Sequence, residues 1–121
     1  MILHLIIISI IFFGNFISGT NASANCDAGQ TFTSRTTLKV AVDACIAINS
    51  AGHSNMSNWN VSSVPDMGNL FYDKTNFNTD ISGWDVSNVT NMRYMFENAN
   101  SFDKDIGGWN VSSVTNMYQM F

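Results

Sequence analysis

A stretch of 25 residues that recurs along the chain constrains the fold more than any other feature. The copy from Trp84 to Gly108 reads WDVSNVTNMRYMFENANSFDKDIGG, and similar stretches begin at Trp59 and Trp109. Aligning the copies gives five columns of identical residues: Trp59, Trp84 and Trp109; Val61, Val86 and Val111; Val64, Val89 and Val114; Met67, Met92 and Met117; Phe71, Phe96 and Phe121. A fixed period of this size predicts turns of chain that stack on one another.

The pattern inside each repeat predicts a strand followed by a helix. Trp84 and Val86 alternate with polar residues, which is typical of a short strand with one buried face. The apolar residues from Val89 to Phe96 recur at steps of three and four, which predicts a short α or 3₁₀ return helix. We therefore expect an α/β solenoid of short parallel strands and short return helices, with like residues of successive turns in contact.

The N-terminal segment, residues 1–24, reads as a secretory signal. Leu3 to Phe16 is strongly apolar, and Ala22-Ser23-Ala24 is a small-x-small cleavage site, so the mature chain would begin at Asn25. A retained membrane anchor is the alternative, although the apolar run is short for a spanning helix.

The chain has two cysteines, Cys26 and Cys45. Export would place them in an oxidising compartment, where a pair usually forms a disulfide. A lipid on Cys26 is the other reading. It is disfavoured because Asn25 and Ser23 stand where a lipoprotein signal requires a small and an aliphatic residue.

An amphipathic helix is expected over residues 37–49, with Leu38, Val42, Cys45 and Ile46 on one face. We interpret residues 25–55 as a helical cap, stapled by the disulfide, that covers the apolar end of the first turn. An ordinary surface helix is the alternative. Residues 56–121 would then form about two and a half repeats. Because they stop at a core position, Phe121, we expect a C-terminally truncated piece of a longer protein.

The repeat resembles that of the BspA-like leucine-rich-repeat surface proteins. The resemblance rests on W-[DN]-V-S-[NS]-V-[TP]-[DN]-M-x-x-[ML]-F followed by F-[ND]-x-D-I, and it covers Met56 to Phe121. It implies a leucine-rich-repeat-like solenoid on the cell surface, in proteins linked to adhesion, and it brings no catalytic residues. In the first turn, Pro65 and Gly68 depart from the pattern, and this should weaken the return helix there.

Composition excludes some function classes. The formal net charge is −4, which argues against nucleic acid and anionic membranes as partners. A membrane contact is expected only if the N-terminal segment is retained. No acid–base pair or nucleophile constellation is evident, so we expect no enzyme and no cofactor.

The candidate binding residues are the polar positions of the predicted strands. Partners usually bind the strand face of such repeats, and these positions are Asn60, Ser62, Asp85, Ser87, Asn110 and Ser112. A protein or glycan surface would suit them. The alternative is a solvated face whose side chains hydrogen-bond along the ladder.

Aspartates and asparagines offer two further kinds of site. Asp80 and Asp105 offer oxygen ligands, but their spacing fits no calcium motif, so we expect them to accept backbone N–H groups and expect no metal. N-glycosylation sequons begin at Asn55, Asn60, Asn88 and Asn110. In a eukaryotic source these could carry glycans; otherwise the repeat itself requires the motif.

Together these features predict a secreted or cell-surface repeat module for protein or carbohydrate interaction, including adhesion. The alternative is a structural spacer in a longer protein whose activity lies in a missing C-terminal domain.

Overall fold

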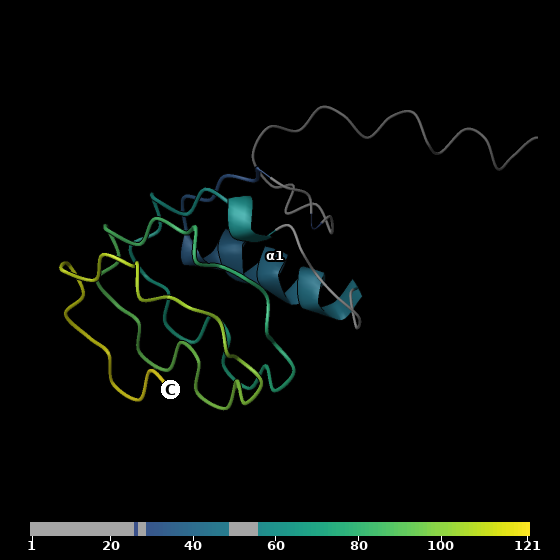
Figure 1. The fold of residues 1–121 in the computed structure, drawn as a ribbon. Coiled ribbons are helices and arrows are strands. Elements are labelled where there is room, and N and C mark those ends of the chain that lie inside the picture. Colours follow the sequence, from purple (N-terminus) through teal and green to yellow (C-terminus); the bar gives the residue numbers. More distant parts are fainter. Residues whose placement is uncertain (1–25, 27–28, 49–55) are drawn as a thin grey trace, which may run out of the picture.

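The computed structural model of the chain describes residue 26, residues 29–48 and residues 56–121. These residues contain one α-helix, α1 (Arg35–Ile48), and one 3₁₀ helix, η1 (Met56–Asn58). The remaining described chain runs as successive loops, teal to yellow in Figure 1, with α1 on the side away from the C-terminus. The predicted signal segment, residues 1–24, and the sequon at Asn55 lie outside the described residues.

Helix α1 begins two residues before the expected start. Ser34 caps it: the Thr37 N–H donates to Ser34 Oγ at 3.3 Å, and the Leu38 N–H donates to the Ser34 carbonyl at 3.2 Å. Its buried face contains Leu38, Val42 and Cys45, as the amphipathic pattern predicted.

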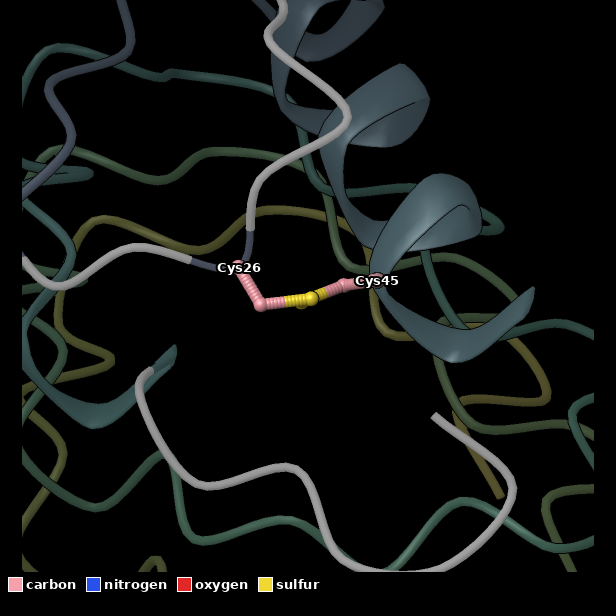
Figure 2. Close-up of a disulfide and its surroundings, with 2 residues drawn as sticks. All are labelled: Cys26 and Cys45. Atoms are coloured by element: carbon pink, nitrogen blue, oxygen red, sulfur yellow. A yellow bond between two sulfur atoms is a disulfide. The ribbon is translucent and has the colours of Figure 1, made fainter. Parts of the chain in front are cut away.

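The disulfide predicted from the sequence is confirmed. It joins Cys26 to Cys45, with 5.2 Å between the two Cα atoms (Figure 2). Because Cys45 is buried in the face of α1, the bond ties the N-terminal segment to the helix at a point where the helix meets the core.

The segment before α1 lies against the first turn of the repeat. The Phe32 N–H donates to the Asn60 carbonyl at 2.9 Å, and the Asn60 N–H donates to the Gln30 carbonyl at 2.7 Å. The ring of Phe32 packs on Trp59 with 5.0 Å between centroids, while Trp84 packs on Trp59 at 6.4 Å. Phe32 therefore gives the first tryptophan an aromatic neighbour from outside the repeat.

Ion pairs also connect α1 to the first turn. Asp43 contacts Lys39 of the same helix at 2.6 Å and Lys74 of the first turn at 2.8 Å. Partial burial raises the pKa of Asp43, but the hydrogen bonds from the two lysines outweigh it, and the net shift is downward. The Arg35–Asp66 pair, at 3.5 Å, is exposed and adds little.

The strand prediction is wrong. Within residues 26, 29–48 and 56–121 there is no β-strand, and pairing is limited to three isolated parallel bridges: Thr31 with Asn60, Asp66 with Asn91, and Asn91 with Asn116. The segment around Trp84 and Val86 does alternate in burial. Its backbone, however, closes four-residue β-turns: the Trp84 N–H donates to the Ile81 carbonyl, and the Val89 N–H donates to the Val86 carbonyl.

The return-helix prediction is also wrong, because the backbone N–H groups there alternate between two kinds of acceptor. Every second N–H donates to the next turn at 2.9–3.0 Å: Met67, Asn69, Phe71 and Asp73 bond to the carbonyls of Asn91, Arg93, Met95 and Glu97. Of the N–H groups between and after them, that of Gly68 donates to the Asp66 side chain, and those of Leu70, Tyr72 and Lys74 donate three residues back. Positive φ angles at Asn69, Asp73, Tyr94 and Asn98 break helical continuity.

The leucine-rich-repeat-like α/β solenoid is therefore not the fold of this chain. A helix would direct each N–H four residues back, and a strand would direct its N–H groups to neighbouring strands. In this chain, some N–H groups of each 25-residue turn bond to the neighbouring turn, and others bond three residues back. No turn has a return helix for Pro65 and Gly68 to weaken. Pro65 has no backbone N–H, so it cannot donate the hydrogen bond that Thr90 and Thr115, at the same position, donate to the preceding turn.

Like residues of successive turns form the core. Rings stack between Phe71 and Phe96 at 5.2 Å, and between Phe77 and Phe102 at 5.6 Å. The indole N–H of Trp84 donates to the Met56 carbonyl at 2.7 Å, and that of Trp109 donates to the Ile81 carbonyl at 3.3 Å. Trp84 and Trp109 thus fill the core and donate to a carbonyl of the preceding turn.

Removing the disulfide tests how much the N-terminal segment contributes to stability. The Cys26→Ser, Cys45→Ser double variant should lose about 2–5 kcal/mol of unfolding free energy in denaturant titrations, because the cross-link restricts the unfolded chain. As a control, a reducing agent should destabilise the wild type and leave the double variant unchanged. Equal stability of wild type and double variant would contradict the prediction.

The methionine column provides a matched pair of substitutions. Met92 is fully buried, whereas Met117 is 44% exposed at the same position of the last turn. Met92→Ala should lower the unfolding free energy by about 2–5 kcal/mol because it leaves a cavity. Met117→Ala should cost far less. Equal losses in denaturant titrations would show that the column does not form the core.

Candidate functional site

The six polar residues predicted to bind a partner lie on exposed corners, one corner in each turn. At each corner an Asn or Asp accepts hydrogen bonds from the serine two residues later, and this makes an Asx turn. Asp85 Oδ1 accepts from the Ser87 N–H at 3.1 Å and from Ser87 Oγ at 2.6 Å. Asn60 accepts from Ser62 in the same two ways, and Asn110 accepts from the Ser112 N–H.

These bonds change how the corner residues are interpreted. The equivalent residues recur in each 25-residue repeat, but they lie in Asx turns rather than on the face of a strand. Their oxygen acceptors are partly used by the neighbouring serines, so the motif Asn-Val-Ser or Asp-Val-Ser has a structural use. Their part in binding stays a prediction.

Local hydrogen bonds also set the acidity of two of the carboxylates. The side-chain hydrogen bond from Ser87, followed by the one from its backbone N–H, lowers the pKa of Asp85. The Ser82 backbone N–H, at 2.9 Å from Asp80 Oδ1, is the largest cause lowering the pKa of Asp80. In both cases the donors favour the charged carboxylate.

The aspartates considered for calcium bond to the backbone. Asp80 accepts from Ser82, and Asp105 Oδ1 accepts from the Gly107 N–H at 2.8 Å. In the described part of the chain, no group of three or more His, Cys, Asp or Glu side chains is arranged to hold a metal ion.

Three of the four sequons lie in the described residues, and all three asparagines are exposed. Asn60 and Asn110 use their side-chain oxygens in the Asx turns. Asn88 donates from Nδ2 to the Ser62 carbonyl of the preceding turn at 3.0 Å. Sequon asparagines therefore have structural contacts, whether or not they carry glycans.

A cluster of tyrosines that sequence analysis missed lies on another part of the surface. We call Tyr72, Tyr94 and Tyr118 the tyrosine stripe. Their rings meet edge to face, with centroids 6.4 Å apart for Tyr72 and Tyr94 and 5.5 Å apart for Tyr94 and Tyr118. Tyr72 is 40% exposed and Tyr118 is 59% exposed.

Aligning the repeats could not have found the stripe. Its members occupy three different columns, since Glu97 and not Tyr94 aligns with Tyr72. Tyr94 and Tyr118 meet because the backbone pairs residues of successive turns one position out of the repeat register: the Tyr94 N–H donates to the Tyr118 carbonyl at 3.0 Å. That pairing would have indicated the contact between these two tyrosines.

Arg93 adds a positive charge to the stripe. Its guanidinium lies 4.5 Å from the centroid of the Tyr94 ring and 5.4 Å from that of Tyr118. Its Nη2 donates to the Tyr94 hydroxyl at 2.9 Å, and this hydrogen bond raises the pKa of the guanidinium. At the other end, the charges of Asp73 and then Glu97 raise the pKa of Tyr72. The stripe therefore has a basic end and an acidic end.

No helix in the described residues is long and apolar enough to cross a membrane. Residues 21–121 match the model of a family described as "Mycoplasma protein of unknown function, DUF285", and the chain belongs to that family. The match includes α1 as well as the repeats. No curated protein and no solved structure matches the chain. The resemblance to BspA-like leucine-rich-repeat proteins is corrected by this result, because the matching family is a different one.

The acidity of Asp85 yields a pH prediction. A pKa lowered by folding means that the charged carboxylate stabilises the fold above its unfolded pKa, about 3.9, and that this stabilisation is lost as pH falls through the folded value. Asp85→Asn keeps an oxygen acceptor, as Asn60 and Asn110 have at the same position. Its melting temperature should be slightly below the wild type's at neutral pH, where the carboxylate is charged, and should fall less steeply below about pH 4.

Thermal melts at a series of pH values measure this difference. Asp103→Asn is the control, because the Asp103 carboxylate accepts no hydrogen bond within the described residues, and it should follow the wild type. A melting temperature of Asp85→Asn that falls as steeply as the wild type's in acid would refute the Asx-turn interpretation.

Proposed function

We propose that this member of the DUF285 family is an extracellular module that binds a protein partner through the tyrosine stripe. The observation that carries the proposal is the row of Tyr72, Tyr94 and Tyr118, with Arg93 over the rings of Tyr94 and Tyr118, on turns joined by backbone hydrogen bonds. Tyrosine and arginine are among the residues most enriched at the energetic centres of protein interfaces.

The geometry of the stripe favours binding at low entropic cost. Arg93 already touches two rings and donates to one hydroxyl, so its side chain loses less freedom when a partner arrives. The carboxylates of Asp73 and Glu97 beside Tyr72 favour a partner with a basic group near one end of the contact. In each edge-to-face pair, the edge of one ring covers part of the face of the other, which leaves less flat area for a sugar.

An extracellular location is part of the proposal. It is supported by the apolar N-terminal segment with its small-x-small site and by the disulfide between Cys26 and Cys45, because disulfides persist in oxidising compartments. The net charge of −4 supports a protein rather than a nucleic acid as partner.

Two other functions are kept as alternatives. The corners at Asn60, Asp85 and Asn110 are exposed and hydrogen-bonding, which favours a glycan or protein contact there. A structural spacer is favoured by the use of the corner side chains in holding the turns. The experiment below separates these three functions.

The test compares binding of purified variants to an array of extracellular matrix proteins and to a glycan array. Arg93→Ala and the double variant Tyr72→Ser, Tyr118→Ser should reduce binding to a protein target at least about tenfold, which is the effect of removing an interface centre. The matched control is Val40→Ser, which removes a 50% exposed apolar side chain from α1. It should leave binding unchanged.

The remaining outcomes each exclude the proposal. If Asp85→Arg with Ser87→Arg abolishes binding while the stripe variants retain it, the corners are the site. If only glycans bind, the partner class is wrong. If nothing binds on either array, the result favours the spacer.

A further inference from the structure

The guanidinium of Arg93 is held in place, yet most of its hydrogen-bond donors have no partner. It lies over the rings of Tyr94 and Tyr118 at 4.5 and 5.4 Å, and its Nη2 donates to the Tyr94 hydroxyl at 2.9 Å. A guanidinium has five N–H donors. In the described part of the chain, the Arg93 side chain has no other acceptor and no carboxylate at ion-pair distance. An exposed, fixed fork of donors is best matched by a carboxylate that accepts two hydrogen bonds.

Two carboxylates at the Tyr72 end of the stripe lack a cation. The Asp73 N–H donates to the Glu97 carbonyl at 3.0 Å, which places these two residues beside each other on successive turns. Asp73 Oδ1 accepts from Asn98 Nδ2 at 2.7 Å. Among the described residues, neither carboxylate has an ion-pair partner, and that of Glu97 accepts no hydrogen bond. Both charges act on Tyr72, whose pKa they raise, so this end of the stripe favours a cation.

The two ends of the stripe carry complementary charges that the fold keeps apart. Arg93 and Glu97 are four residues apart, and opposite charges at this spacing meet on a helix. Tyr94 has a φ of 56°, however, so the segment is not helical. The Arg93 side chain lies on tyrosine rings instead. Each end therefore matches the other in charge without contacting it within one molecule.

A second copy of the stripe supplies the missing partner at both ends. In an isologous dimer each contact occurs twice, because both copies use the same surface. When the two-fold axis crosses the row of tyrosines, the two rows run in opposite directions. The Arg93 end of one copy then faces the Asp73 and Glu97 end of the other. An axis along the row would bring like charges together, and their repulsion disfavours that arrangement.

We propose that two copies of this chain associate through their tyrosine stripes in an antiparallel, two-fold arrangement, in which Arg93 of each copy pairs with the carboxylates of Asp73 and Glu97 of the other. This inference rests on the proposed function, because it names a second copy as a partner of the same surface. The contact consists of a short row of rings with charges at its ends, so we expect a weak, reversible dimer, as is typical of small interfaces.

Charge reversals test the two-fold pairing in sedimentation equilibrium runs with the full chain. The wild type should show a reversible monomer–dimer equilibrium over a concentration series. Arg93→Glu and Glu97→Lys each place like charges at both contacts, so each variant alone should dimerise at least about tenfold more weakly.

Mixing the two variants provides the decisive arm of the experiment. In the mixed dimer, the introduced glutamate faces the introduced lysine at one contact, and the native Arg93 faces the native Glu97 at the other. Dimerisation of an equimolar mixture should therefore recover most of the tenfold loss. Recovery also shows that both variants are folded, since an unfolded chain would not regain the contact.

Lys104→Glu is the matched control for a reversal of charge. Lys104 contacts no residue of the stripe within the part of the chain that the structure describes, so this variant should dimerise as the wild type does. Three outcomes would overturn the inference: a wild type that is monomeric at every concentration, reversal variants that dimerise like the wild type, or a mixture that dimerises no better than its components.

The dimer and the proposed function fail separately. A monomeric wild type that loses binding to a protein target on Arg93→Ala overturns the dimer, keeps the proposed function and identifies a different protein as the occupant. Recovery in the mixture, together with target binding that Arg93→Ala leaves unchanged, supports the dimer and shows that the stripe is not the site for that target.

Discussion

The alternation of backbone donors between Met67 and Asp73 is the constraint on which the rest of the structure depends. Every second N–H bonds to the following turn, while those of Leu70 and Tyr72 bond three residues back and that of Gly68 bonds to the Asp66 side chain, so each turn is joined to its neighbour while keeping its own bends. The two uses require left-handed residues at Asn69 and Asp73, and at Tyr94 and Asn98 in the next turn. The backbone of these turns is therefore neither a regular helix nor a regular strand. The hydrogen bonds between turns set the separation at which like side chains meet.

Contacts of three kinds join the segment before the repeats and α1 to the first turn. Phe32 packs on the first tryptophan, the disulfide holds the segment to α1, and Lys74 of the first turn bonds to Asp43 of the helix. Within the repeats, the phenylalanine column continues from turn to turn, because Phe71 stacks on Phe96 and Phe96 stacks on Phe121.

The polar residues divide into those that build the turns and those that are left to face a partner. Asp85 and Ser87 satisfy each other, Asp80 and Asp105 accept backbone N–H groups, and Asn88 bonds to the preceding turn. Repetition of these residues thus reflects repetition of the same bend. The stripe of Tyr72, Tyr94 and Tyr118 follows a different spacing and has no comparable use inside the turns.

The sequence by itself determined the 25-residue register, the composition of the buried columns, the helix that became α1 and the pairing of Cys26 with Cys45. These follow from hydrophobic periodicity and from the number of cysteines, which act through burial and covalent chemistry. Only the tertiary structure decided the backbone path. The alternation at Trp84 and Val86 fits a strand, and the spacing from Val89 to Phe96 fits a helix. Both patterns report which side chains are buried and do not report where the N–H groups bond. Because those bonds join residues of successive turns one position out of register, the structure also decided that Tyr94 and Tyr118, from different columns, meet beside Arg93.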